Sequence, residues 1–320
     1  MFGSARARFE GLPGPLQGAL LMTAAAAAFA GMNAIIRALN FELHPFQTAF
    51  LRVLAGLAFM LPWLARAGLA ALATASHKLY LSRALVGYAS MLCWFSALAL
   101  MPVAEATALS FTAPLFATAA AALLLGEIVR LRRWTATIVG FLGAMVVIRP
   151  GFSAIELAHL LVLASAALGG WNTITVKQLT RSDSANVIIV YMLLYLVPLS
   201  LLPALFVWQW PSWHALGLVA LLGMCATLGH QSFTRALAVC EASYVLPFDF
   251  ARLPMVAFLA FLAFGEVPDI WTWIGGGIIV ASTVYIARRE AQLARLEKAE
   301  ALASEAGAVA KRPDPAKPGP

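Results

Sequence analysis

The chain has 320 residues, of which 62% are hydrophobic and 12% are charged. Charged residues make up about 25% of a typical soluble domain, so this composition excludes an ordinary soluble fold and indicates an integral membrane protein. The net charge of +7 does not indicate nucleic-acid binding, because the basic residues lie in loops and the C-terminal tail and form no patch interleaved with aromatic residues.

Apolar segments of about 20 residues, the length that crosses a bilayer, recur along the whole chain. They predict ten membrane-spanning helices, at 16–37, 45–65, 78–100, 103–125, 133–149, 155–176, 186–207, 213–236, 242–264 and 269–287. The connections between them are short and leave no room for a soluble domain. The first segment resembles a signal peptide, but its counterpart in the repeat described next is internal, so we expect it to be retained.

The sequence repeats itself with an offset of 139 residues. The repeated positions are Gly31/Gly170, Asn33/Asn172, 97–99/236–238, Gly126-Glu127/Gly265-Glu266, Trp134/Trp273 and Arg149/Arg288. Each copy holds five spans, an odd number, so the second copy must cross the bilayer in the opposite direction. The predicted fold class is therefore an all-α integral membrane protein whose ten transmembrane helices form two inverted five-helix repeats. The expected division is a cytoplasmic N-terminus (1–15), a first repeat (16–150), a second repeat (151–288) and a charged helix with a disordered tail (289–320).

The distribution of basic residues predicts the orientation. Seventeen Lys and Arg residues lie in the N-terminus, the C-terminal tail and the alternate loops on one side, whereas only Arg37 and Arg149 lie in the opposite loops. Loops rich in Lys and Arg stay in the cytoplasm. We therefore expect a multi-pass protein of the bacterial inner membrane with both termini cytoplasmic.

Catalytic and metal-binding signatures are missing from the sequence. Cys93, Cys225 and Cys240 fall in or beside apolar spans and give neither a disulfide framework nor a metal-ligand spacing. The five histidines are scattered, and no H-E-x-x-H or G-x-S-x-G motif occurs. These observations disfavour an enzyme and predict no metal and no cofactor. A channel or a membrane scaffold stays open as an alternative, although no ring of like charges supports it.

Two five-span halves, each with a Pro-containing helix, a Gly-Glu pair and a helix bearing Trp and Gly, resemble the EamA-type transporters of the drug/metabolite transporter superfamily. The resemblance covers residues 16–290 and is carried by His44-Pro45-Phe46 with Arg52, by Pro102 to Glu127 including 110–116, by Arg133-Trp134 to Arg149-Pro150, and by Pro247 to Glu266. The fourth and ninth spans look most similar to the branch that contains bacterial S-adenosylmethionine importers.

The resemblance implies a secondary transporter that moves a small polar or zwitterionic metabolite by alternating access. No ATP-binding loop is present, so a gradient would drive it. The alternatives are an importer of a planar metabolite such as S-adenosylmethionine or riboflavin, and an exporter of amino acids, metallophores or drugs. The expected partners are a small-molecule substrate and the lipid bilayer but no nucleic acid, and a homodimer is left open.

Ionisable residues deep in a bilayer usually mark a transport pathway. Arg52 lies about seven residues into the second span, or roughly 10 Å below the outer surface. Its alternatives are a substrate contact and a bond to helix-end carbonyls. Asp249 and Arg252 share one face of the ninth span at i, i+3 spacing. They either neutralise each other as a structural pair or line the central cavity, where Arg252 would bind an anionic group and Asp249 an amine or a proton.

Two further ionisable residues are candidates for ion coupling beside Asp249. Glu105 begins the fourth span, where a carboxylate also favours the positive end of a helix. His230 lies near the inner end of the eighth span and could titrate near neutral pH or serve as a satisfied bundle histidine.

The remaining candidates are polar, aromatic or helix-breaking residues within the spans. The repeat-related Asn33 and Asn172 either join helices or contact the substrate. Trp94 and Trp171 lie inside their spans and either stack on a planar substrate or pack the bundle. Pro114 and Pro254 interrupt corresponding helices of the two halves, which indicates a hinge at the binding site or a tolerated kink.

Overall fold

The computed structural model describes residues 12–113, 115–116, 131–148, 156–240, 242–285, 288 and 292, and gives the backbone alone at 131–134 and 242–243. Within these residues every regular element is helical. The α-helices are α2 (Gly14–Leu39), α3 (Pro45–Ala67), α4 (His77–Leu100), α5 (Val103–Ser110), α7 (Leu131–Ile148), α8 (Leu157–Leu179), α9 (Ala185–Phe206), α10 (Trp213–Val239), α11 (Ala242–Val245) and α12 (Arg252–Phe264). Two 3₁₀ helices, η1 (Leu69–Leu72) and η2 (Leu246–Ala251), and a C-terminal helix (Ile270–Tyr285) complete the described elements.

Ordinary start and stop signals define the long helices. Pro45 occupies the first turn of α3, where its missing N–H leaves no hydrogen bond unmade. Ser212 caps α10 by accepting a hydrogen bond at Oγ from the N–H of Ala215 (3.1 Å). Gly265, with φ +67°, ends α12 in the left-handed conformation that glycine adopts most readily. Seven segments of the described chain are long and apolar enough to cross a membrane.

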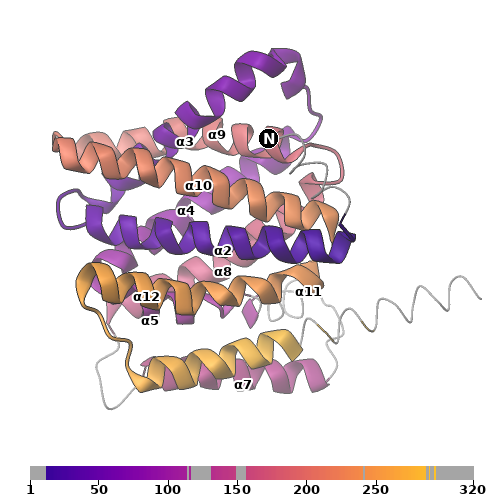
Figure 1. Cartoon of the computed structure of the whole chain (residues 1–320), viewed down its shortest axis with the longest axis vertical. Helices are drawn as coiled ribbons and strands as arrows, with labels where there is room; N and C mark the ends of the chain where they lie inside the picture. The colour runs from indigo at the N-terminus through magenta and orange to yellow at the C-terminus, as the bar shows by residue number, and fades with distance from the viewer. Residues whose placement is uncertain are drawn as a thin grey trace, which may run out of the picture.

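The two halves of the chain are interleaved. The helices lie side by side in Figure 1, with α7 and the C-terminal helix together at one end of the molecule. The first helix of the first half, α2, packs against α10 of the second half, and α8 of the second half packs against α4 of the first. Because α8 and α10 correspond to α2 and α4 in the sequence repeat, these two contacts are equivalent.

A pair of helix caps follows the same repeat. Arg37 on α2 donates a hydrogen bond from Nη1 to the carbonyl of Leu98 at the end of α4 (3.0 Å). Lys177 on α8 donates from Nζ to the carbonyl of Leu237 at the end of α10 (2.5 Å). The last carbonyls of a helix lack partners within the helix, so a basic side chain there stabilises the end. Leu98 and Leu237 are 139 residues apart, which supports the duplication at the level of individual contacts.

The fourth and ninth predicted spans are not continuous helices. The helix α5 ends at Ser110, and the ninth segment is divided into α11, the 3₁₀ helix η2 and α12. Pro254 is the third residue of α12, in the first turn, where a proline removes no helical hydrogen bond. The sequence predicted a helix break at Pro254. In the structure the break comes before this residue. Pro114 lies outside the described residues.

The contact between α3 and α10 depends on a glycine. A Cβ atom at Gly223 would lie 2.5 Å from the Cβ of Ala55 and 2.9 Å from the backbone carbonyl carbon of the same residue. We expect Gly223→Ala to destabilise the protein by about 1–3 kcal/mol, because the crowded atoms belong to a backbone that cannot rotate away. Gly217→Ala is the matched control, since no atom lies within 4 Å of its Cβ position on the same helix.

Thermal unfolding in detergent checks this prediction. Both variants gain the same helix propensity, so the difference between their melting temperatures isolates the crowding. Equal melting temperatures for Gly223→Ala and Gly217→Ala would contradict the packing.

Candidate functional site

Two repeat-related phenylalanines meet where the broken helices face each other. Phe111 follows α5 and Phe250 lies in η2, and their ring centroids are 4.8 Å apart at an interplanar angle of 85°. The two positions are 139 residues apart. Equivalent residues of two related halves can touch only close to the axis that relates them. This contact therefore indicates the centre of the bundle.

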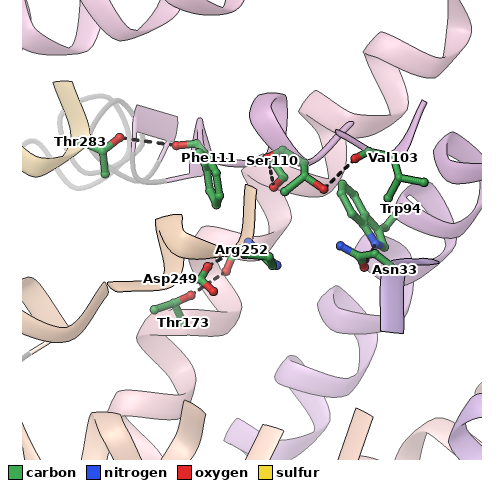
Figure 2. A network of polar contacts seen from close by, with 11 residues as sticks. Asn33, Trp94, Val103, Ser110, Phe111, Thr173, Asp249, Arg252 and Thr283 are labelled. Atoms are coloured by element: carbon green, nitrogen blue, oxygen red, sulfur yellow. Dashed lines mark hydrogen bonds and ion pairs between the residues drawn. The ribbon is translucent and has the colours of Figure 1, made fainter. Parts of the chain in front are cut away.

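An ion pair lies beside this centre. Arg252 donates a hydrogen bond from Nη2 to Oδ2 of Asp249 (2.9 Å), and the two side chains are only 18% and 16% exposed. The guanidinium of Arg252 also lies over the ring of Phe111, 5.3 Å from its centroid, in a favourable cation–π arrangement. Oδ1 of Asp249 and Nε of Arg252 are buried without a partner. Figure 2 shows the pair next to Phe111.

A second polar contact joins α2 to α4. Trp94 donates a hydrogen bond from Nε1 to Oδ1 of Asn33 (3.2 Å), as Figure 2 shows. Asn33 is fully buried, and its Nδ2 has no hydrogen-bond partner. The contact orients the indole edge toward the interior of the bundle and leaves an amide donor free for a ligand.

Arg52 on α3 is brought to His230 on α10. The distance from Nη2 of Arg52 to Nε2 of His230 is 2.6 Å, and Nη1 of Arg52 lies 3.6 Å from the sulfur of Met91. The ring of Phe29 contacts His230 with centroids 5.1 Å apart, and the guanidinium of Arg252 lies 5.9 Å from the centroid of the same ring. Phe29 thus connects the Arg52–His230 contact to the Asp249–Arg252 pair, so both belong to one interior region.

Arg83 on α4 belongs to the same region and was missed in the sequence. It is 6% exposed, and its Nε and Nη1 have no hydrogen-bond partner. Its charge acts electrostatically on both Arg52 and His230. Arg83 lies near the start of α4 and resembles an ordinary flanking residue. The available signal was that, among the Lys and Arg residues, only Arg52, Arg83 and Arg252 lie more than one residue inside the ends of the predicted spans.

Two other candidates lie between α4 and α8 instead. Trp171 is 49% exposed and donates a hydrogen bond from Nε1 to Oγ of Ser82 (3.2 Å). Asn172 packs against Gly87, where an added Cβ would lie 3.2 Å from the amide oxygen Oδ1. The structure does not bring these two residues to the Phe111–Phe250 centre.

Glu105 lies at one end of the bundle, in the first turn of α5. Its Oε1 is 3.2 Å from Nε2 of His159 on α8. His159 also accepts a hydrogen bond at Nδ1 from the backbone N–H of Glu156 (3.1 Å) as part of a capping box. The carboxylate therefore connects the broken helix of the first half to the first helix of the second half.

The interior region offers a ligand mainly hydrogen-bond donors. Its buried polar atoms without a partner are Nδ2 of Asn33, Nε of Arg52, Nε and Nη1 of Arg83, the hydroxyl of Tyr88, Oδ1 of Asp249 and Nε of Arg252. Unpaired buried polar groups are costly and in a native protein require a partner such as water or a ligand. The matching ligand is one rich in acceptor atoms, with flat surfaces that can lie against aromatic rings.

Comparison with known proteins gives several full-length relatives. The chain is 35% identical over 289 residues to a riboflavin transporter of Vibrio cholerae, covering 89% of this chain and 97% of that protein. It is 34% identical to a riboflavin transporter of Rhizobium johnstonii, covering 85% and 91% of the two chains. A Rickettsia prowazekii S-adenosylmethionine uptake transporter is 29% identical over 78% of this chain and 84% of its own.

A solved crystal structure shares the fold. It has a TM-score of 0.61 at 20% sequence identity and covers 85% of this chain and 98% of its own. The family model described as the EamA-like transporter family matches residues 16–149 and again residues 156–288, so it accounts for both halves. The chain therefore belongs to the EamA-like transporter family.

Proposed function

We propose that this protein is a gradient-driven secondary transporter of riboflavin, in which two inverted five-helix repeats alternate access to the interior region around Phe111 and Phe250. Two full-length relatives with 35% and 34% identity are riboflavin transporters. Broken helices at corresponding places in the two halves support an alternating-access site near the midplane.

The excess of unpartnered donors in the interior carries the proposal. Riboflavin has a flat ring system whose carbonyl oxygens and ring nitrogens accept hydrogen bonds. Trp94 and Phe111 offer aromatic surfaces for stacking, and Nδ2 of Asn33 and Nε of Arg252 offer donors in the same region. A planar, acceptor-rich metabolite satisfies these groups, whereas one without acceptor atoms would leave the donors unpaired.

S-adenosylmethionine is the second candidate substrate. Oδ1 of Asp249 is a buried acceptor without a partner and would suit a cationic sulfonium or ammonium group. A relative named for uptake of this compound is 29% identical to the chain. Riboflavin is preferred because the interior offers more unpartnered donors than acceptors.

Growth of a riboflavin auxotroph tests the proposal. A bacterial strain that can neither synthesise nor import riboflavin should grow on low external riboflavin when it expresses this chain. The same strain with the empty vector should need a much higher concentration. Equal requirements, with the protein present in the membrane, would refute riboflavin as a substrate.

We further propose that the protein lies in the inner membrane of a bacterium and that both of its termini are cytoplasmic. Seventeen basic residues on one side against two on the other support this orientation. A reporter enzyme that is active only in the cytoplasm, fused after Arg288, should therefore be active. Activity of a periplasm-specific reporter at the same position would contradict the inverted-repeat topology.

Roles in gating and coupling complete the proposed mechanism. The change from η2 to α12 just before Pro254 would serve as the hinge, because the backbone there already departs from the α-helix. Asp249, His230 and Glu105 are the proposed proton carriers, and each contacts a basic or titratable partner: Arg252, Arg52 and His159, respectively.

A further inference from the structure

Two arginines are buried in the interior without a counter-charge. Arg52 is 5% exposed and Arg83 is 6% exposed, and the two guanidiniums repel each other. In the part of the chain that the structure describes, no carboxylate forms an ion pair with either of them. Burying an unpaired charge costs several kcal/mol, so such an arrangement persists in a bilayer mainly where it serves a function.

His230 does not supply the missing charge. An arginine can only donate, so Nε2 of His230 accepts the hydrogen bond from Arg52, and the ring is neutral with its proton on Nδ1. Protonation of this histidine would add a third positive charge. The neutral ring satisfies one of the five N–H groups of Arg52 and leaves the charge uncompensated.

The other titratable groups near Arg83 are also engaged elsewhere or uncharged. Tyr80, on the same helix, donates its hydroxyl to Oδ2 of Asp183 (2.9 Å), and that oxygen also accepts from Thr74 (2.9 Å). Asp183 is thereby held in the loop before α9. The buried hydroxyl of Tyr88 has no partner and adds one more donor to the cluster.

A narrow gap lies beside Arg52. It lies between α3, α9 and α10 and is lined by Arg52, His230 and Thr227 together with apolar residues. In this conformation the gap is too narrow to admit a water molecule. Nε of Arg52 and, on α4, Nε and Nη1 of Arg83 are buried donors without a partner.

We propose that Arg52 and Arg83 bind an anionic group, a phosphate or a carboxylate, on the transported molecule. This inference rests on the proposed function and names the substrate class more closely. Riboflavin itself is uncharged, so its 5′-phosphate, flavin mononucleotide, should be the better substrate. A guanidinium matches the oxygens of a phosphate or carboxylate in geometry and charge, and such charge-assisted bonds are about twice as strong as neutral ones.

Transport into proteoliposomes that hold the purified full chain tests the inference. Labelled riboflavin, flavin mononucleotide and S-adenosylmethionine serve as the uncharged, phosphate and carboxylate probes. For the wild type we expect kcat/KM for flavin mononucleotide to exceed that for riboflavin by about tenfold or more, the effect of one charge-assisted hydrogen bond. Preference for S-adenosylmethionine would support the anion subsite, with a carboxylate as its occupant, only where the preference is lost in the arginine variants.

Substitutions of the two arginines locate the effect. The measured quantity is kcat/KM for flavin mononucleotide divided by kcat/KM for riboflavin. Arg52→Gln and Arg83→Gln should each lower this ratio by about tenfold. Arg52→Lys and Arg83→Lys retain the charge and should lower it less. Arg235→Gln is the control, because Arg235 is exposed on α10, and it should keep the wild-type ratio. If a Gln variant fails to insert into the membrane, the transport ratios of the Lys variant and of the wild type still test the anion subsite.

The outcomes separate this inference from the proposed function. Transport of riboflavin with no preference for either flavin mononucleotide or S-adenosylmethionine would overturn the anion subsite and leave the riboflavin proposal intact. Anion preference that survives in both Gln variants would also overturn it. If no flavin is transported, the proposed function fails. In that case the anion subsite stands only if S-adenosylmethionine is transported and its transport depends on Arg52 and Arg83. Without such transport the anion subsite is overturned as well.

Discussion

Neutralising either member of the Asp249–Arg252 pair is expected to abolish transport while the protein still inserts into the membrane. Each side chain uses one atom for the 2.9 Å contact and keeps a second buried atom, Oδ1 of Asp249 or Nε of Arg252, without a partner. Asp249→Asn and Arg252→Gln remove both the pair and the group offered to the ligand. We expect transport to fall to background, because the loss of one hydrogen bond to a charged group alone lowers kcat/KM at least about tenfold and each variant also leaves its former partner as an unpaired buried charge.

The double variant decides what the pair does. A purely structural pair would tolerate replacement of both partners, since exchanging a whole buried ion pair is often nearly neutral. We expect Asp249→Asn/Arg252→Gln to remain inactive, because the substrate contacts are still missing. Transport by the double variant at the wild-type rate would show that the pair only stabilises η2 and α12. Size-exclusion profiles in detergent control for misfolding.

Replacing Trp94 with leucine should weaken riboflavin transport far more than the same change at Trp171. Trp94 is oriented by its hydrogen bond to the fully buried Asn33, whereas Trp171 is half-exposed and bonded to Ser82. Stacking of a base-like ring on an aromatic side chain contributes about 1–3 kcal/mol, so Trp94→Leu should raise KM about tenfold. Trp94→Phe keeps an aromatic face and should have a smaller effect.

Trp171→Leu is the matched control for this prediction. Its KM should change less than about twofold, the range usual for exposed substitutions within 0.5 kcal/mol. Equal effects at the two tryptophans would place the substrate between α4 and α8, where Asn172 also lies, and would contradict a site at the Phe111–Phe250 contact.

The long helices could be predicted from the sequence because a bilayer restricts the choices. A span must satisfy every backbone hydrogen bond internally, so length and hydropathy alone indicate a helix. The predicted segment 45–65 is observed as Pro45–Ala67, and 213–236 is observed as Trp213–Val239. The internal repeat could likewise be identified from the sequence, and the caps formed by Arg37 and Lys177 repeat in the same way.

The breaks in the fourth and ninth spans could not be placed from hydropathy, because both segments are predominantly apolar on either side of the break. Side-chain hydroxyls donate hydrogen bonds to carbonyls at the end of α5. Thr112 donates to the carbonyl of Leu109 (2.7 Å), and Thr283 on the C-terminal helix donates to that of Phe111 (3.5 Å). Such hydroxyls offer the backbone an alternative to the helix, but only the folded arrangement brings Thr283 to Phe111.

In the candidate site, contacts between residues close in sequence could be predicted, whereas contacts between distant residues could not. Asp249 and Arg252 are three residues apart, so helical spacing alone predicts their contact. The contact between Arg52 and His230 spans 178 residues and depends on how α3 packs against α10. No pattern in one sequence pairs them. The burial of Arg83 was missed for the same reason, since its depth depends on the helices around it.

Counterflow of riboflavin tests the central claim most directly. Proteoliposomes loaded with unlabelled riboflavin should take up external labelled riboflavin transiently above its equilibrium level, because an alternating-access carrier exchanges one molecule for another across a single site. Proteoliposomes without internal riboflavin should show no such overshoot. A channel would also equilibrate the label but without an overshoot, so uptake that never exceeds equilibrium in loaded vesicles, or no uptake at all, would contradict a riboflavin carrier.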